Sequence, residues 1–165
     1  MRAPREPLDV ERLSHEGAVV SFDFELADLP QLRGTHAELT GRVHGSVRFG
    51  REREFAVADL TLEGGATLQC QRCMGAMRQP LAARTRVALV GSQADGARVP
   101  EDLEPVLATG GHISMEQLLA EELLLALPIV PLHAQNDAAC TAKGPQVSDG
   151  ETHRPFAGLA ELVKR

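Results

Sequence analysis

The sequence predicts an α+β fold, in which an antiparallel, partly bulged β-sheet is covered by a central helix and a short C-terminal helix. Two stretches within residues 36–90 alternate between apolar and polar side chains, as strands with one solvated face do. Residues 114–127 instead carry apolar side chains at helical spacing. Strand patterns come first along the chain and helical patterns later, and this order is typical of α+β proteins.

The first predicted strand runs from Ala37 to Phe49, where odd positions are apolar or small and even positions are polar. A turn is predicted at the charged residues 51–54, and a second strand begins at Phe55. The apolar positions of that strand change parity by Leu60. This change predicts a β-bulge near Ala58–Asp59.

Gly64–Gly65 are predicted to break the chain before a short strand that leads into Cys70. After the cysteines, residues 81–89 alternate again and predict a further strand. Residues 91–112 are rich in Gly, Pro and acidic residues. They predict a loop, with a short strand at 105–108.

A helix is predicted from Ser114, a good N-cap that forms a capping box with Gln117, to the residue before Pro128. Glu122 falls within the apolar arc of this helix, whereas Leu124 lies on the opposite face. A lone buried carboxylate is costly. We therefore expect Glu122 to pair with one arginine of the central region, the candidates being Arg72, Arg78, Arg84 and Arg86.

The predicted domain organisation has three parts. Residues 1–133 form a single α+β domain that contains the C-x-x-C knuckle, and residues 134–153 form a polar, flexible tether. Residues 154–165 form a short helix whose apolar stripe contains Phe156, Leu159, Ala160 and Val163. So short a helix is marginal alone, and we expect it to dock on the body.

Charge is unevenly distributed in a chain whose net charge is −6. Residues 33–98 carry ten arginines, no lysine and six carboxylates, whereas both ends are acidic. Guanidinium groups suit bidentate contacts with phosphate. We predict that four arginines emerge on one solvent-facing side of the sheet and contact ribosomal RNA phosphates or an acidic protein surface: Arg42, Arg48, Arg84 and Arg86.

Composition argues against several other functions. Five Phe, no Trp and no Tyr leave little for stacking bases. No Gly-rich phosphate loop and no nucleophile elbow are present, so no catalytic or cofactor-binding residue is assigned. The N-terminus lacks an apolar signal region, and the longest apolar stretch is too short to span a membrane. With three cysteines, these features favour a reducing cytoplasm.

Cys70 and Cys73 form a C-x-x-C pair with three interpretations. Together with Cys140 and His133 they make a set that is chemically adequate for zinc, if the tether folds back onto the knuckle. A thiol redox protein using Cys70 and Cys73 is the alternative, although redox pairs usually begin a helix. The third interpretation is a turn with reduced, structural thiols. We expect this one, with zinc as the only metal for which the residues are suited and no other cofactor.

Three motifs together resemble the bacterial YceD family, the large ribosomal RNA subunit accumulation proteins. They are LQCQRCM, the helix end LLLALPIVPLH and the closing PFAGLAEL, and the likeness runs from about residue 14 to the C-terminus. Some family members carry a second cysteine pair in the tether, where this chain keeps only Cys140.

The resemblance implies a non-enzymatic role in bacterial ribosome biogenesis. The expected function is to support synthesis, processing or stability of the large-subunit (23S) ribosomal RNA. The partners it implies are a large-subunit rRNA precursor, a ribosomal or assembly protein, or both. Neither a membrane nor a small-molecule substrate is expected.

Overall fold

The computed structural model describes residues 6–35, 39–135, 137–138 and 140. Its main sheet has five strands in the order β2-β3-β4-β5-β6, which confirms the predicted α+β class. All neighbouring pairs are antiparallel except β5 and β6. The strands are β2 (Val19–Glu25), β3 (Thr40–Glu52), β4 (Phe55–Gln69), β5 (Ala76–Val90) and β6 (Glu104–Leu107).

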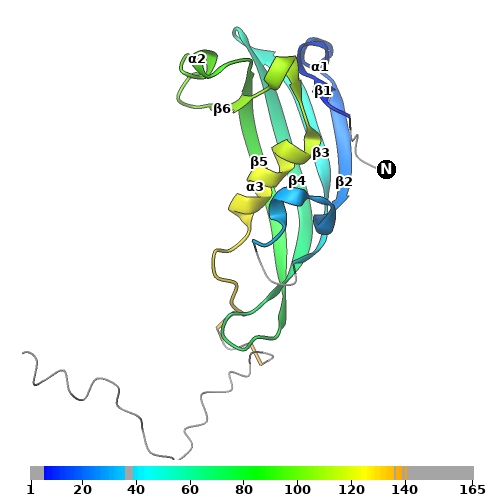
Figure 1. The fold of residues 1–165 in the computed structure, drawn as a ribbon, viewed down its shortest axis with the longest axis vertical. Helices are drawn as coiled ribbons and strands as arrows, with labels where there is room; N and C mark the ends of the chain where they lie inside the picture. Colours follow the sequence, from blue (N-terminus) through cyan, green and yellow to red (C-terminus); the bar gives the residue numbers. More distant parts are fainter. Residues whose placement is uncertain (1–5, 36–38, 136, 139, 141–165) are drawn as a thin grey trace, which may run out of the picture.

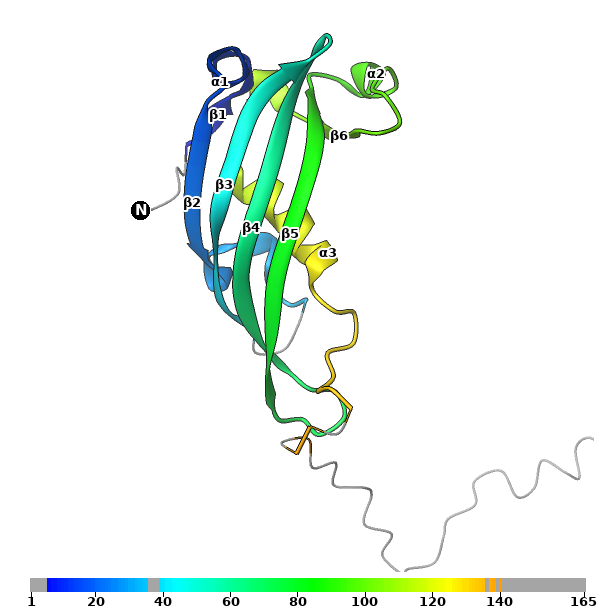
Figure 2. The same cartoon turned by 180° about the vertical axis from the view of Figure 1, so that it is seen from behind.

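Helix α3 (Met115–Ala126) crosses one face of this sheet, and the other face is largely open (Figures 1 and 2). Helix α1 (Val10–Glu16) and the small β1–β7 ladder, Leu8–Asp9 with His112–Ile113, lie at one end of the long strands. The short helix α2 (Gln93–Gly96) lies near the same end. The β4–β5 turn, which carries the cysteine pair, lies at the opposite end. No helix of the described chain is long and apolar enough to cross a membrane.

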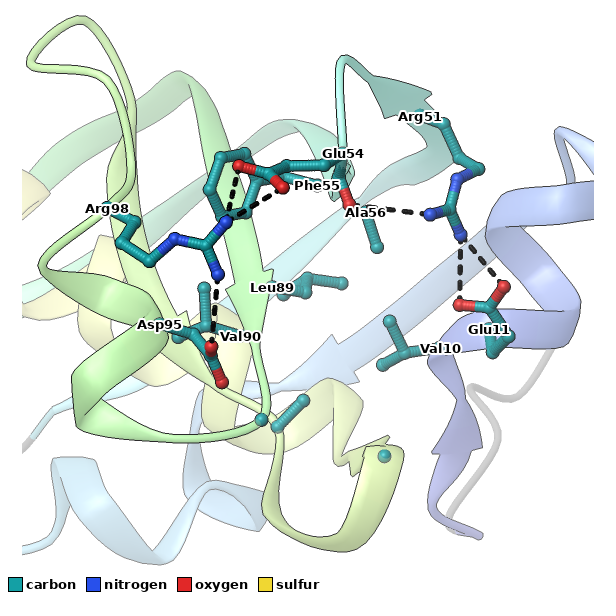
Figure 3. A pocket seen from close by; sticks show the side chains of 13 residues that line it. Val10, Glu11, Arg51, Glu54, Phe55, Ala56, Leu89, Val90, Asp95 and Arg98 are labelled. Atoms are coloured by element: carbon teal, nitrogen blue, oxygen red, sulfur yellow. Dashed lines mark hydrogen bonds and ion pairs between the residues drawn. The ribbon is translucent and has the colours of Figure 1, made fainter.

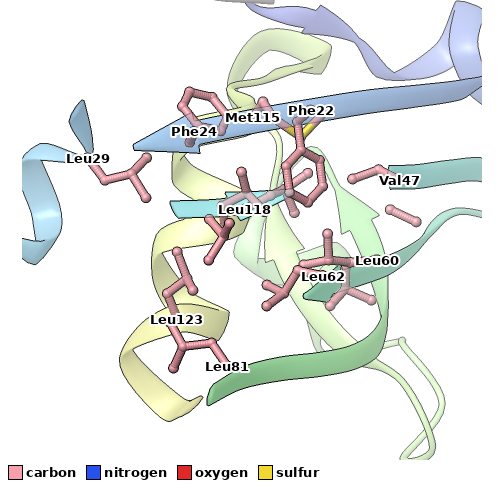
Figure 4. Close-up of a cluster of buried hydrophobic side chains, with 14 of the residues drawn as sticks. Phe22, Phe24, Leu29, Val47, Leu60, Leu62, Leu81, Met115, Leu118 and Leu123 are labelled. Atoms are coloured by element: carbon pink, nitrogen blue, oxygen red, sulfur yellow. The ribbon is translucent and has the colours of Figure 1, made fainter. Parts of the chain in front are cut away.

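The core lies between the sheet and α3. Phe22, Leu60 and Leu62 point from the sheet toward Leu118 and Leu123 of the helix (Figure 4). Three short 3-10 turns, Leu26–Asp28, Pro30–Leu32 and Thr109–Gly111, connect these elements. The predicted start of α3 is confirmed, because the Ser114 hydroxyl accepts a 3.0 Å hydrogen bond from the Gln117 N–H.

The bulge predicted near Ala58–Asp59 is wrong. Strand β4 pairs residue by residue with β3 and with β5 through this point, without an extra residue. The parity of the apolar residues changes because both faces of β4 are buried near its start. Ala58 faces the main core, whereas Phe55 and Val57 join a second cluster with Leu103 on the opposite face.

The chain break predicted at Gly64–Gly65 is also wrong, because both glycines lie inside β4. Gly64 faces the core, where a Cβ atom would collide with the carbonyl oxygen of Arg42 on β3. Gly45 is similar, since a Cβ there would collide with the Thr61 carbonyl and lie 2.8 Å from the Phe22 ring. These glycines let the strands approach each other closely where the sheet bends, rather than ending a strand.

The N-terminal elements and the parallel edge extend the sheet beyond its predicted limits of residues 36–90. Asp9 caps α1 by accepting from the Arg12 N–H, and Gly17 ends the helix at φ 61°. Strand β2 then pairs with β3. The short strand predicted at 105–108 is present as β6, and the long 91–103 connection allows it to run parallel to β5.

The pairing predicted for Glu122 is wrong. Among the described residues no ion pair involves this carboxylate. Burial raises the pKa of Glu122, and the nearby carboxylates of Glu104 and Glu121 raise it further, against a smaller opposite effect of Thr85. Glu122 is half-buried at the edge of the helix–sheet contact, where water replaces an arginine as its partner.

Replacing Glu122 with Gln should therefore leave stability unchanged near pH 7 or increase it by up to about 0.5 kcal/mol. A carboxyl group whose pKa is raised by folding costs stability above that pKa. The cost disappears at about pH 3, where the folded and unfolded states are both protonated. Denaturant midpoints at the two pH values measure the difference. A marked loss of stability near neutral pH would reveal a cationic partner instead.

Two predicted segments lie outside the described residues for most or all of their length. The closing helix at 154–165 is one, and most of the tether at 134–153 is the other. Their organisation stays a prediction. The described end of the tether nevertheless includes Cys140, whose position is informative.

Candidate metal centre

The C-x-x-C pair occupies the turn between β4, which ends at Gln69, and β5, which begins at Ala76. The Cys70 N–H donates to the Gly75 carbonyl at 2.9 Å, and the Met74 N–H donates to the Cys70 carbonyl at 2.8 Å. Met74 adopts a left-handed φ of 60° to close the turn. These contacts fix the backbone of the turn, so both thiols are held on its inner side.

The chain after α3 returns to this turn. Pro128 and Pro131 prevent the helix from continuing, and the segment runs down to the β4–β5 turn (Figure 1). The Gln71 N–H donates to the Pro131 carbonyl at 2.8 Å, which anchors the segment. His133 follows and lies against both cysteines, with its N–H 3.5 Å from the Cys70 Sγ.

The His133 ring is oriented as a metal ligand would be. Its Nδ1 lies 3.4 Å from the Cys73 Sγ, and its Nε2 lies 3.2 Å from the Ala76 carbonyl oxygen. A carbonyl accepts, so Nε2 carries the proton and Nδ1 presents a lone pair toward the thiols. Metal-binding histidines typically make this second hydrogen bond, which fixes their tautomer.

Arg72 brings in the third cysteine. Its Nε donates to the Cys140 Sγ at 3.0 Å, and its guanidinium also donates to the His133 carbonyl at 3.3 Å. The Cys140 thiol raises the pKa of Arg72 through this hydrogen bond and through its charge. The tether therefore does fold back onto the turn, as a four-ligand site requires.

The three sulfurs and a ring nitrogen of His133 all lie within 4.8 Å of one another. Zinc–sulfur bonds of about 2.3 Å in a tetrahedron place neighbouring ligands roughly 3.5–3.8 Å apart. The four side chains thus need only small rotations to close around an ion. Three Cys and one His form a ligand set of structural zinc sites, in which every coordination position belongs to the protein.

The environment of the thiols favours a deprotonated, metal-binding state. Burial by itself raises the pKa of Cys70, but backbone N–H groups of Cys73, His133 and Arg72 outweigh it and lower this pKa to about 5. For Cys73 the Gly75 N–H favours the thiolate, yet burial and the neighbouring sulfurs raise its pKa overall. One thiolate forms readily, and a cation would be needed to stabilise the others.

All four residues of the predicted zinc set are therefore brought together. We expected thiols without metal because Cys140 lay in a tether with no known anchor, and the contact with Arg72 removes that reason. The sequence did not reveal the roles of Arg72 and the Ala76 carbonyl. The only available signal was the Pro128–Pro131 spacing, which indicates an extended return of the chain.

The four predicted contact arginines lie on the open face of the sheet, as expected. Arg42 and Arg48 share that face of β3 with Arg84 and Arg86 of β5 through the intervening β4. The face is mixed in charge rather than uniformly basic. Arg42 pairs with Asp23 at 2.6 Å, and Arg86 pairs with Glu52 at 2.9 Å.

Arg48 and Arg84 differ from the other two, because both are exposed and neither forms an ion pair within the described chain. Their guanidinium groups are available to a partner. The Arg42 hydrogen bond, by contrast, holds the pKa of the Asp23 carboxyl below its usual range, so that pair is already satisfied. Contact of these arginines with RNA or protein stays a prediction.

A cavity of about 260 Å³ lies at the far end of the sheet from the cysteines, between α1 and the segment around α2 (Figure 3). Its floor is apolar, and two arginines stand at its rim. Arg51 contacts Glu11 at 2.8 Å and Arg98 contacts Glu54 at 2.9 Å, so both guanidinium groups are occupied. The rim holds the ends of the molecule together and offers no free charge from the labelled arginines to a ligand.

Comparison with known proteins identifies relatives. The family model described as large ribosomal RNA subunit accumulation protein YceD matches residues 58–163. A protein of Haemophilus influenzae with the same description is 30% identical over 105 residues, which cover 59% of this chain and 60% of the relative. The aligned part thus spans about three fifths of that relative's length. No solved structure matches this chain.

Proposed function

Because this chain belongs to the YceD family, we propose that it is a non-enzymatic factor supporting the synthesis, processing or stability of large-subunit ribosomal RNA. The family match carries this proposal. The printed name of the relative refers to accumulation of that RNA and to no chemical reaction. The proposed partners are a large-subunit rRNA precursor, a ribosomal or assembly protein, or both.

The open face of the sheet is the surface we propose for this contact. It extends over β3, β4 and β5 without a covering helix (Figure 2). Arg48 and Arg84 offer exposed guanidinium groups there, which suit phosphate oxygens or carboxylates. Neighbouring carboxylates neutralise Arg42 and Arg86, and this limits loose binding to any RNA. Contact is therefore local and needs a surface of matching shape.

The four-residue cluster serves this function as a structural zinc centre. Zinc held by Cys70, Cys73, His133 and Cys140 would cross-link the β4–β5 turn, the segment after α3 and the start of the tether. All four ligands come from the protein, so no position is left for substrate or water. The buried Cys70 thiol is poorly placed for redox exchange, which requires access to a partner disulfide.

Reversing both free arginines, Arg48→Glu with Arg84→Glu, should weaken association with large-subunit precursors about tenfold or more, because each loses a charge-assisted hydrogen bond. Co-sedimentation of the full-length protein with precursor particles measures this. If the contacts are to phosphates, the slope of log affinity against log salt should also fall by about 0.7–0.9 for each.

The matched control is Arg33→Glu with Arg53→Glu, which changes net charge equally at exposed sites outside the open face. It should bind nearly as the wild type does. Normal co-sedimentation of the Arg48/Arg84 variant would exclude this face as the contact surface. An equal loss in both variants would indicate an effect of net charge alone.

A further inference from the structure

An apolar surface remains exposed between α3 and the metal centre. Within the nine residues 124–132, five large apolar side chains are exposed, and Leu125 and Ile129 reach 78% and 96%. We call these residues the α3-end surface: Leu124, Leu125, Ile129, Val130 and Leu132. Single exposed apolar residues are ordinary, but a continuous group marks a surface that another element covers.

This surface is fixed in place by the fold. Below it, Pro131 accepts a hydrogen bond from Gln71, and His133 contacts the Cys70 thiol and the Ala76 carbonyl. Above it, Leu123 and Leu127 are buried in the core and hold the end of α3. The exposed side chains therefore cannot turn inward without breaking these contacts, and an occupant must come to them.

The end of the same chain has the chemistry to fill this role. Residues 154–165, RPFAGLAELVKR, place Phe156, Leu159, Ala160 and Val163 at helical spacing. Their structure lies outside the described residues. An amphipathic helix of this length is marginal in water and needs an apolar surface against which to form.

The described chain ends at the right place for such an occupant. Cys140 is held beside His133 by Arg72, next to the α3-end surface in the chain path (Figure 1). The thirteen residues 141–153 can span at most about 45 Å and average roughly 20 Å if flexible. Leu132 is one residue from His133, so the surface lies within this reach.

Charge is complementary as well. Helix α3 carries Glu116, Glu121 and Glu122 and no basic residue. Residues 154–165 carry Arg154, Lys164 and Arg165 against one acidic residue, Glu161. A basic amphipathic helix beside an acidic one gains favourable ion pairs at the rim of an apolar contact.

We propose that residues 154–165 dock intramolecularly on the α3-end surface as a short helix. Docking buries Ile129 and its neighbours and closes the chain over the segment that supplies His133. The tether keeps the local concentration of the helix high, so a small contact suffices. This contact is independent of the proposed role in ribosomal RNA accumulation.

Hydrogen–deuterium exchange of the full-length protein tests the proposal. In the wild type, amides of residues 156–163 should exchange about tenfold or more slowly than in the free peptide, since they are hydrogen-bonded in a docked helix. Ile129→Ser with Leu125→Ser should remove that protection. Val19→Ser is the matched control, because Val19 is an exposed apolar residue on β2, and it should leave protection unchanged.

The reciprocal variant Phe156→Ser should increase binding of an apolar dye to the α3-end surface without altering the sheet. Exchange of residues 156–163 at the free-peptide rate in the wild type would overturn the proposal. Protection that grows between about 5 and about 200 µM protein would overturn it too, because the occupant would then be the same segment of a second copy.

Discussion

Purified without added metal, this chain is expected to carry about one zinc ion, and Cys73→Ser is expected to carry almost none. The four ligand atoms already lie within 4.8 Å of one another, and His133 is held with Nδ1 toward the thiols. Structural zinc sites bind with apparent free energies of about 10–16 kcal/mol in small peptides. Loss of one of four ligands should therefore lower affinity by at least about 100-fold.

Metal removal should loosen one end of the molecule without unfolding it. The core between the sheet and α3 does not depend on an ion, so the far-UV circular dichroism should persist after chelation. The thermal midpoint should fall by several degrees, at about 2–4 °C for each kcal/mol lost in a chain of this size. Elemental analysis and calorimetry with and without chelator measure both effects.

His133→Ala and His44→Ala form the matched pair for this prediction. His44 is exposed on the open face of β3, far along the sheet from the cysteines, and its removal should leave zinc content unchanged. Arg72→Ala should retain the ion but bind it about 10–100-fold more weakly, because Arg72 holds Cys140 in position. Metal-free protein that gains no stability from added zinc would leave the thiols as a structural turn.

Gly64→Ala is expected to destabilise the fold by about 2–4 kcal/mol, whereas Gly65→Ala should change stability by less than about 1 kcal/mol. A Cβ at position 64 would collide with the Arg42 carbonyl and lie 2.8 Å from the Val43 Cα, and neither backbone atom can move without bending β3. At position 65 the nearest atom is the Gln79 carbonyl oxygen, at an ordinary 3.6 Å.

The two glycines are a stringent pair because they are adjacent in β4 and share the same chemistry. Alanine reduces unfolded-state entropy equally at both, which by itself favours the folded state slightly. Any difference in urea midpoints therefore measures the close approach of β3 and β4. Equal midpoints would mean that the strands separate easily at this point, and that the bend of the sheet is not fixed by Gly64.

Local patterns determined much of the fold in advance. Alternation defined the core face of β3, and the Ser114 cap and Pro128 marked the limits of α3. The same patterns were misleading in β4. Phe55 and Val57 changed the apparent parity because a second small cluster covers them, and a strand's sequence does not state how many of its faces are buried.

The candidate site shows the same division. The sequence by itself supplied the four ligand types, since C-x-x-C, a third cysteine and a histidine are visible without a structure. Their meeting could not be read from spacing, because Cys73 and Cys140 are far apart in the chain. Only the tertiary structure decided it, through the Gln71–Pro131 hydrogen bond and the Arg72–Cys140 contact. Residue types and periodicity are local properties that a sequence carries directly, whereas convergence of distant side chains depends on long-range packing, which no local pattern encodes.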